Sequence, residues 1–174
     1  PEDKSEKNSP TLAAHRDSLL RFQRQRHRSQ APSANDIEWR QFRRDHLTAL
    51  LRRLSVEVAL VRPRARLRVE CLGGTRGGYP IEWETTMAYS QALQDWRLWL
   101  REGLLDTAVL TKYFETQINP RDWTEWSNFL RINSSRRSVL PLIASKYNQA
   151  SEVLTLLHRL QKSAPASSLS GVGL

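Results

Sequence analysis

The stretch 88-AYSQALQDWRLWLREGLLD-106, together with the apolar run that follows it, decides how this chain is organised. Four of its side chains recur at helical spacing, namely Tyr89, Leu93, Trp96 and Leu100. That spacing predicts one helix with an apolar face, and Gly103 marks its C-terminal end. Residues 105–113 are mostly apolar and predict a strand of the buried kind. The stretch is therefore expected to be a helix that leads directly into a strand.

The same alternation of strand and helix extends to the rest of the chain. Further strands are expected in three apolar or small-residue segments, at 66–72, 136–147 and 167–174. Helices are expected from Pro120 and over 151–162, and two more precede the first strand. Strands that alternate with helices of about a dozen residues favour right-handed βαβ units. The expected fold class is therefore α/β with a parallel sheet of about four strands.

The two N-terminal helices are separated by the polar segment 29–36. The first helix is expected from Thr11, with Thr11 or Ser9 as its cap. The second is expected to run from its cap at Asp36 to a stop at Pro63. Its apolar positions are expected to form a single stripe that faces the core: Ile37, Phe42, Leu47, Leu50, Leu51, Leu54, Val58 and Val61.

The chain is strongly basic, with 27 Lys and Arg against 18 Asp and Glu and a net charge of +9. Its arginines are concentrated before Glu70, in the runs RFQRQRHR, RQFRRDH, LLRRL and RPRARLR. One interpretation is that these runs form the solvated outer faces of helices. The other is that they bind an acidic partner such as a nucleic acid. Charge alone leaves both open.

Several function classes lack their sequence signatures. Cys71 is the only cysteine, so the chain has neither a disulfide framework nor zinc-finger spacing. The four histidines are scattered without metal-ligand spacing: His15, His27, His46 and His158. No run of about 18 apolar residues could span a bilayer, and no signal peptide is visible in a chain that starts at Pro1. Segment 73–78 lacks the Lys-Ser/Thr ending of a phosphate-binding loop, and no cofactor is expected.

Four segments together resemble the C-terminal half of the glycoside-hydrolase-like 10 domain. They are DIEWRQFRRDHLTALLRRLSVEVALVRP, YSQALQDWRLWLREGLLD, the strand that ends in Tyr113, and the W..W..F helix at Trp123, Trp126 and Phe129. The most specific pieces are W..FRRD, QDW..WL.EGLLD, and GG followed by W..T.AYS. The resemblance covers roughly Leu12 to Leu174, in the order and spacing of the family.

The resemblance implies a family-10-type bacterial glycosyl hydrolase on a (β/α)₈ barrel of TIM type. Eight strands are needed to close such a barrel. The chain is therefore expected to be a polar leader, 1–10, followed by the C-terminal half of a barrel, 11–174. The family's strand that ends LDYIRYP, with an acidic residue, is expected immediately before Pro1. The implied partners are a carbohydrate substrate and the missing N-terminal half, and the implied location is outside the cell or in its envelope.

Glu70 is the best-placed candidate for a catalytic carboxyl group. In RLRVECL the side chains of Leu67, Val69 and Cys71 alternate with those of Arg68 and Glu70. If the apolar set meets the helices, Glu70 points into the barrel near the carboxyl ends of its strands, where TIM-barrel active sites lie. It could then be a general acid. The alternative role is that of a spacer ion-paired to Arg68.

The expected substrate contacts lie in the loop after the first strand and at the ends of the next two strands: Arg76, Trp83 and Glu84 in the loop, and Lys112, Tyr113, Glu115 and Tyr147 at the strand ends. Trp83 could stack on a sugar ring, or it could simply anchor a solvated loop that carries Glu84. The family has a polar residue followed by Tyr at 112 and 113, but this chain then departs from its relatives with the letters FET. Four other tryptophans at helical spacing are expected to pack in the core: Trp96, Trp99, Trp123 and Trp126.

Three functions therefore stand beside one another. The first is hydrolysis of O-glycosyl bonds by paired carboxylates, with the isolated 174 residues expected to be inactive because the second carboxylate lies elsewhere. The second is a basic nucleic-acid-binding module, whose affinity would fall steeply with salt. The third is a sugar-binding barrel without catalytic activity.

Overall fold

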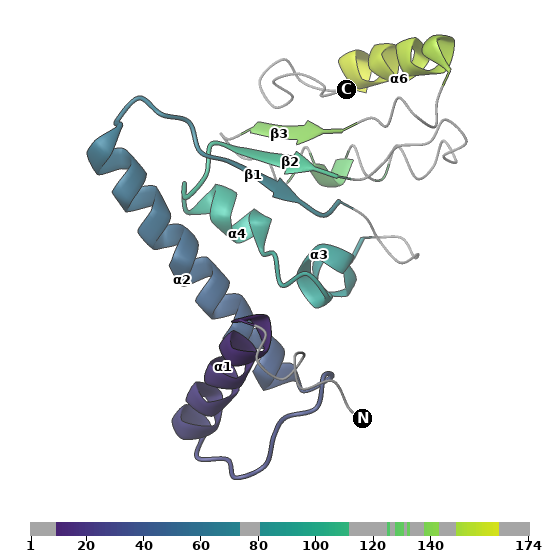
Figure 1. Cartoon of the computed structure of the whole chain (residues 1–174). Coiled ribbons are helices and arrows are strands. Elements are labelled where there is room, and N and C mark those ends of the chain that lie inside the picture. The colour runs from purple at the N-terminus through teal and green to yellow at the C-terminus, as the bar shows by residue number, and fades with distance from the viewer. Residues whose placement is uncertain are drawn as a thin grey trace, which may run out of the picture. The chain divides into compact units, whose positions relative to one another are not determined.

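The structure, a computed structural model, describes residues 10–73, 81–111, 125, 128–130, 132, 138–142 and 149–163 (Figure 1). Its elements in chain order are α1 (Pro10–Arg26), α2 (Ile37–Val61), β1 (Arg68–Cys71), η2 (Trp83–Thr85), α3 (Met87–Ser90), α4 (Trp96–Arg101), β2 (Thr107–Leu110), β3 (Ser138–Pro141) and α6 (Ala150–Ser163).

The strands form one parallel sheet in the order β1-β2-β3. Val69 pairs with Ala108 and Ala108 with Val139, so these three residues lie at the same level across the sheet. The predicted α/β class with a parallel sheet is confirmed for these three strands. The strand predicted at 167–174 lies outside the described residues.

The chain divides into two compact units, residues 1–46 and 47–174. In the first unit, Phe22 of α1 packs edge-on against Trp39 and Phe42 of α2, at centroid distances of 5.1 and 5.3 Å. The predicted cap is confirmed, because Asp36 Oδ1 accepts a hydrogen bond from the Trp39 N–H at 3.0 Å.

The predicted single helix over 88–103 is wrong, because α3 and α4 are separate. Thr86 caps α3 by accepting a hydrogen bond from the Tyr89 N–H. Asp95 caps α4 by accepting one from the Leu98 N–H. Between the two helices Leu93 adopts a positive φ of 60°, which ends the helical path. A cap in mid-segment thus overrides the regular apolar spacing.

The predicted end of this segment at Gly103 is confirmed. Gly103 has a φ of 71°, a left-handed conformation that a residue without Cβ adopts at little cost. Its N–H donates to the Leu100 carbonyl at 3.1 Å, and the Leu104 N–H donates to the Trp99 carbonyl at 2.9 Å. These two bonds form a Schellman motif, which satisfies carbonyls at the end of α4.

The prediction that α2 presents one apolar stripe to the core is wrong in part. Phe42 and Leu51 are buried, and Leu47 and Val58 are half-buried. Four other predicted members are exposed, by 43% to 77%: Ile37, Leu50, Leu54 and Val61. The apolar positions spread around the helix, and the core of the second unit covers only one side of its second half. Which of these positions are buried is therefore decided by tertiary packing.

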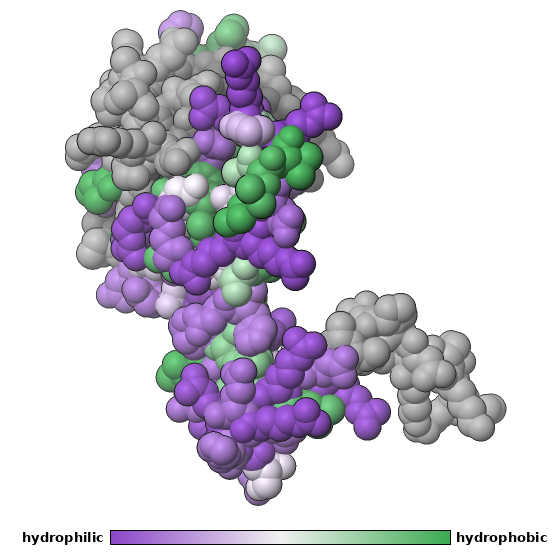
Figure 2. Space-filling view, turned by 90° about the vertical axis from the view of Figure 1, so that its left-hand side faces the viewer, coloured by the Kyte–Doolittle hydropathy of each residue, from purple (hydrophilic) through white to green (hydrophobic). Residues whose placement is uncertain are grey.

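The arginine-rich runs lie mostly in solvent. On α1 and α2 most of the arginines are exposed, and Figure 2 shows hydrophilic side chains over much of this side of the molecule. Arg40 is half-buried, and Arg44 has only 6% of its surface exposed. The interpretation of these runs as solvated helix faces is therefore confirmed for the described runs on α1 and α2, Arg40 and Arg44 apart, whereas the arginines of RPRARLR follow α2 and are exposed outside a helix.

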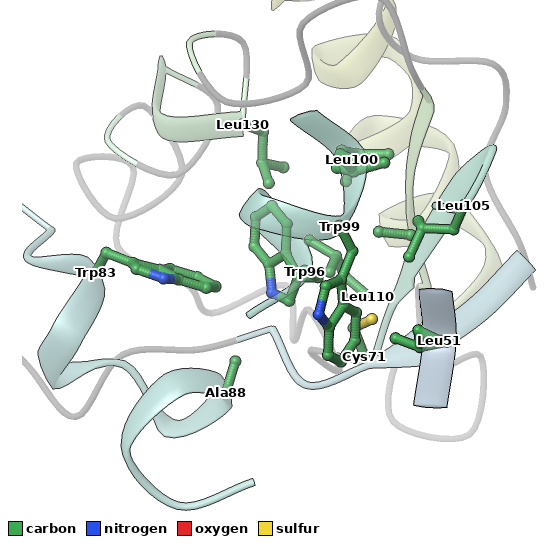
Figure 3. Packing of buried hydrophobic residues seen from close by; sticks show 12 residues of the cluster. Leu51, Cys71, Trp83, Ala88, Trp96, Trp99, Leu100, Leu105, Leu110 and Leu130 are labelled. Carbon is green, nitrogen blue, oxygen red and sulfur yellow. The ribbon is translucent and has the colours of Figure 1, made fainter. Parts of the chain in front are cut away.

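The core of the second unit lies on one face of the sheet (Figure 3). Cys71 and Leu110 from the strands meet Trp96, Trp99 and Leu100 of α4, and all five are fully buried. Trp99 Nε1 donates to Thr48 Oγ1 of α2 at 2.9 Å, which gives its buried polar atom a partner. The prediction that Trp96 and Trp99 pack in the core is confirmed, whereas Trp123 and Trp126 lie outside the described residues.

Candidate active site

Glu70 lies one residue before the carboxyl end of β1, on the face of the sheet opposite the core. Along β1 the exposed side chains of Arg68 and Glu70 alternate with half-buried Val69 and fully buried Cys71. In the parallel register Glu70 is level with Val109 of β2. The predicted alternation of β1 is therefore confirmed.

Among the described residues, no side chain forms a hydrogen bond or an ion pair with the carboxylate of Glu70. Arg68 and Glu70 are both described, and no ion pair joins them. The main-chain carbonyl of Glu70, in contrast, accepts a hydrogen bond from Gln94 Nε2 at 3.4 Å. The structure therefore does not support the role of a spacer paired to Arg68, and it leaves the carboxylate accessible to a ligand.

Gln94 and Thr111 fix the end of the strand that carries Glu70. Gln94 Oε1 accepts a hydrogen bond from the Leu72 N–H at 2.7 Å. The Thr111 N–H and hydroxyl both donate to the Cys71 carbonyl, at 2.9 and 3.2 Å. Neither residue was predicted to matter, because both act through main-chain groups distant in sequence. The positive φ of Leu93, which precedes Gln94, leaves no signature in sequence either.

Trp83 is a core residue in this structure rather than an exposed platform. Only 5% of its surface is exposed, and its ring lies edge-on to Trp96 at 4.8 Å. Its Nε1 donates to Asp95 Oδ1 at 3.1 Å, while the Arg97 guanidinium lies 5.2 Å from the ring centroid. Trp83 therefore anchors η2, as the alternative interpretation expects. The adjacent carboxylate of Glu84 is left in solvent.

The remaining predicted site residues cannot be placed against Glu70. Arg76, Lys112, Tyr113, Glu115 and Tyr147 all lie outside the described residues. Of the predicted set the structure thus describes Glu70, Trp83 and Glu84, and among these Glu70 alone lies on a strand of the sheet.

Cys71 borders the candidate site from the core side. Burial, together with a smaller effect of the nearby Glu70 carboxylate, raises the pKa of its thiol to about 12. The thiol is therefore neutral at physiological pH and behaves as a small apolar side chain. Among the described residues no group of three or more His, Cys, Asp or Glu side chains is arranged to hold a metal ion.

A polar pocket of about 550 Å³ lies at the opposite end of the sheet. The pocket is lined by Arg64, Arg66 and Leu67, which precede β1 in the sequence, and by Asp106, which precedes β2. Arg66 pairs with Asp106 at 3.1 Å, and Asp106 also accepts a hydrogen bond from the Leu67 N–H. This pocket is at the amino ends of the strands, so it is separate from the candidate active site at their carboxyl ends.

A parallel sheet with helices packed against it, and with an acidic side chain near the carboxyl end of one strand, defines an α/β protein with a candidate site at that edge. Comparison with known families makes the class specific. The family model of glycosyl hydrolase-like 10 matches residues 12–138, and the chain belongs to this family. No curated protein matches the chain. In the described part of the chain, no helix combines the length and apolarity needed to cross a membrane.

Proposed function

We propose that this chain carries part of the active site of a glycoside hydrolase, and that Glu70 is one of its two catalytic carboxyl groups. In this proposal the three parallel strands belong to a TIM-type barrel, in its C-terminal half, and the substrate is a polysaccharide or other glycan. The observation that carries the proposal is the position of Glu70 near the carboxyl end of a parallel strand, in a member of a glycosyl hydrolase-like family.

Hydrogen bonds hold the main chain at and beyond Glu70, and a fixed position is what a general acid or a nucleophile needs. The Gln94 and Thr111 hydrogen bonds hold the carboxyl end of β1, so the Glu70 backbone is fixed while its carboxylate stays open. Hydrolysis needs a second carboxyl group on the other side of the glycosidic bond. We propose that this second carboxyl group lies outside the described residues, and that Glu84 contacts substrate from the solvated turn η2.

The test replaces Glu70 by Gln in the natural protein that carries this sequence. Hydrolysis is measured on a panel of polysaccharides and on aryl glycosides with good leaving groups. If Glu70 is the general acid, Glu70→Gln lowers kcat on polysaccharides by a factor of about 10³. The loss on dinitrophenyl glycosides is much smaller, because that leaving group needs no proton. A nucleophile would instead lose both activities.

Asp45→Asn is the matched control, since Asp45 is an exposed carboxylate on α2 whose loss should leave activity unchanged. Circular dichroism verifies that both variants fold. Equal activity of Glu70→Gln and the parent protein would rule out Glu70 as a catalytic group. Binding of oligosaccharides without any turnover by the parent would identify a sugar-binding protein instead of a hydrolase.

A further inference from the structure

The second half of α2 is apolar almost all round, yet much of it lies in solvent. Five of its aliphatic side chains are exposed by 43% to 74%: Leu50, Leu54, Val56, Leu60 and Val61. Figure 2 views this side of the chain and shows hydrophobic side chains gathered among hydrophilic ones. A helix of this kind is normally covered on more than one side. One side of α2 already packs on the core through Leu51.

The uncovered side has the spacing of a helix-pairing seam. Leu50, Arg53, Glu57 and Leu60 follow one another at steps of three, four and three residues, which places them in one row along the helix. Arg53 and Glu57 form only a loose ion pair within α2, at 3.9 Å, with side chains 81% and 60% exposed. Both charges therefore remain available to another helix.

This row is complementary to itself when two copies run antiparallel. Both Leu50 with Leu60 and Arg53 with Glu57 are centred on Ser55. If a twofold axis relates the two helices at the level of Ser55, Leu50 of one copy lies beside Leu60 of the other, and Arg53 lies beside Glu57. Each contact occurs twice by symmetry, and antiparallel helix dipoles add a favourable term. Leu54 and Val56 flank the row and are level with each other in the same arrangement.

We propose that the exposed side of α2 is the interface of a homodimer, in which two α2 helices pair antiparallel through Leu50, Arg53, Glu57 and Leu60. The occupant of this surface is thus a second copy of the chain. About three turns of helix per copy take part, which makes the interface small and the dimer reversible. The proposal is independent of catalysis by Glu70.

Charge-reversal variants test whether Arg53 of one copy lies beside Glu57 of the other. In the 174-residue chain, Arg53→Glu and Glu57→Arg each place two like-charged contacts in the dimer, so each raises the dimer Kd at least about tenfold. The double variant restores opposite charges and returns Kd close to the parent value. Analytical ultracentrifugation over a concentration series measures Kd. Within one helix the pair is exposed and contributes little, so the folding of the monomer is unaffected.

Cysteine pairs test the geometry. The variant Leu50→Cys with Leu60→Cys should form disulfide-linked dimers under mild oxidation, whereas either single variant should not. In one helix these positions are about 15 Å apart, too far for an internal bond. Ile37→Glu is the control for the charge-reversal variants and should leave the dimer Kd unchanged, because Ile37 is an exposed apolar residue of α2 outside the row. A chain that stays monomeric at about 200 µM, or dimers unaffected by charge reversal, would overturn the proposal.

Discussion

The burial and the thiol pKa of Cys71 are set by the residues packed around it rather than by its residue type. Its sequence context, between Glu70 and Leu72, predicts only an alternating strand. The structure buries its side chain completely against α4 and raises its thiol pKa to about 12. The same strand presents Glu70 to solvent on its other face. Two adjacent residues of one strand thus place a neutral thiol in the core and a candidate catalytic carboxyl group on the opposite face.

We therefore expect Cys71 to resist thiol reagents in the folded chain. At pH 8 almost none of this thiol is ionised, and its burial excludes a bulky reagent. Titration with a chromogenic disulfide should detect no thiol in native protein and one thiol per chain in denaturant. Rapid labelling of the native chain would show that this part of the core opens readily.

The contacts between α2 and α4 show how a short helix is stabilised by the elements next to it. Trp99 donates to Thr48 in the core, and Arg52 forms two hydrogen bonds to the Glu102 carboxylate at 2.9 and 2.7 Å on the surface. The hydrogen bonds from Arg52 lower the pKa of Glu102, and its positive charge acts in the same direction. A six-residue helix such as α4 is held by these contacts and by its core packing, since it is too short to be stable alone.

The lowered pKa of Glu102 predicts a stability loss in acid. Since the folded pKa lies below its ordinary value of 4.5, the stabilisation is complete above that pH and is lost as pH falls through the folded pKa. Glu102→Gln should therefore unfold at lower denaturant concentration at pH 7, by a modest amount, and should depend less on pH below 4.5 than the parent. Asp45→Asn controls for the removal of an exposed carboxylate. Parallel pH profiles for the parent and Glu102→Gln would contradict the assignment.

At the scale of the whole molecule, the net positive charge is expected to cause nonspecific binding that an assay for nucleic-acid binding would detect. A net charge of +9, carried largely by exposed arginines, attracts any polyanion. We expect weak binding to single-stranded oligonucleotides that shows no base preference and falls steeply between about 50 and 200 mM salt. Fluorescence anisotropy at several salt concentrations measures this. Tight binding that keeps a sequence preference at high salt would instead favour a nucleic-acid-binding function.

Local signals account for the parts of this protein that sequence alone determined. The alternation in β1, the parallel strand–helix order, the cap at Asp36 and the end of α4 at Gly103 each depend on a few neighbouring residues. Such features follow from side-chain periodicity and from backbone hydrogen bonds near helix ends. Family resemblance then supplied the family, glycosyl hydrolase-like 10, because it depends on segments spread along the chain.

Only the tertiary structure decided which apolar residues are covered. The burial of Trp83 and the exposure of Leu50 and Leu60 on α2 depend on elements distant in sequence. An apolar side chain gains the same free energy wherever water is excluded, so its type predicts that it is to be buried but not by which partner. Directional hydrogen bonds, such as those of Asp95 to Trp83 and of Gln94 to the end of β1, form only once packing has brought their partners together.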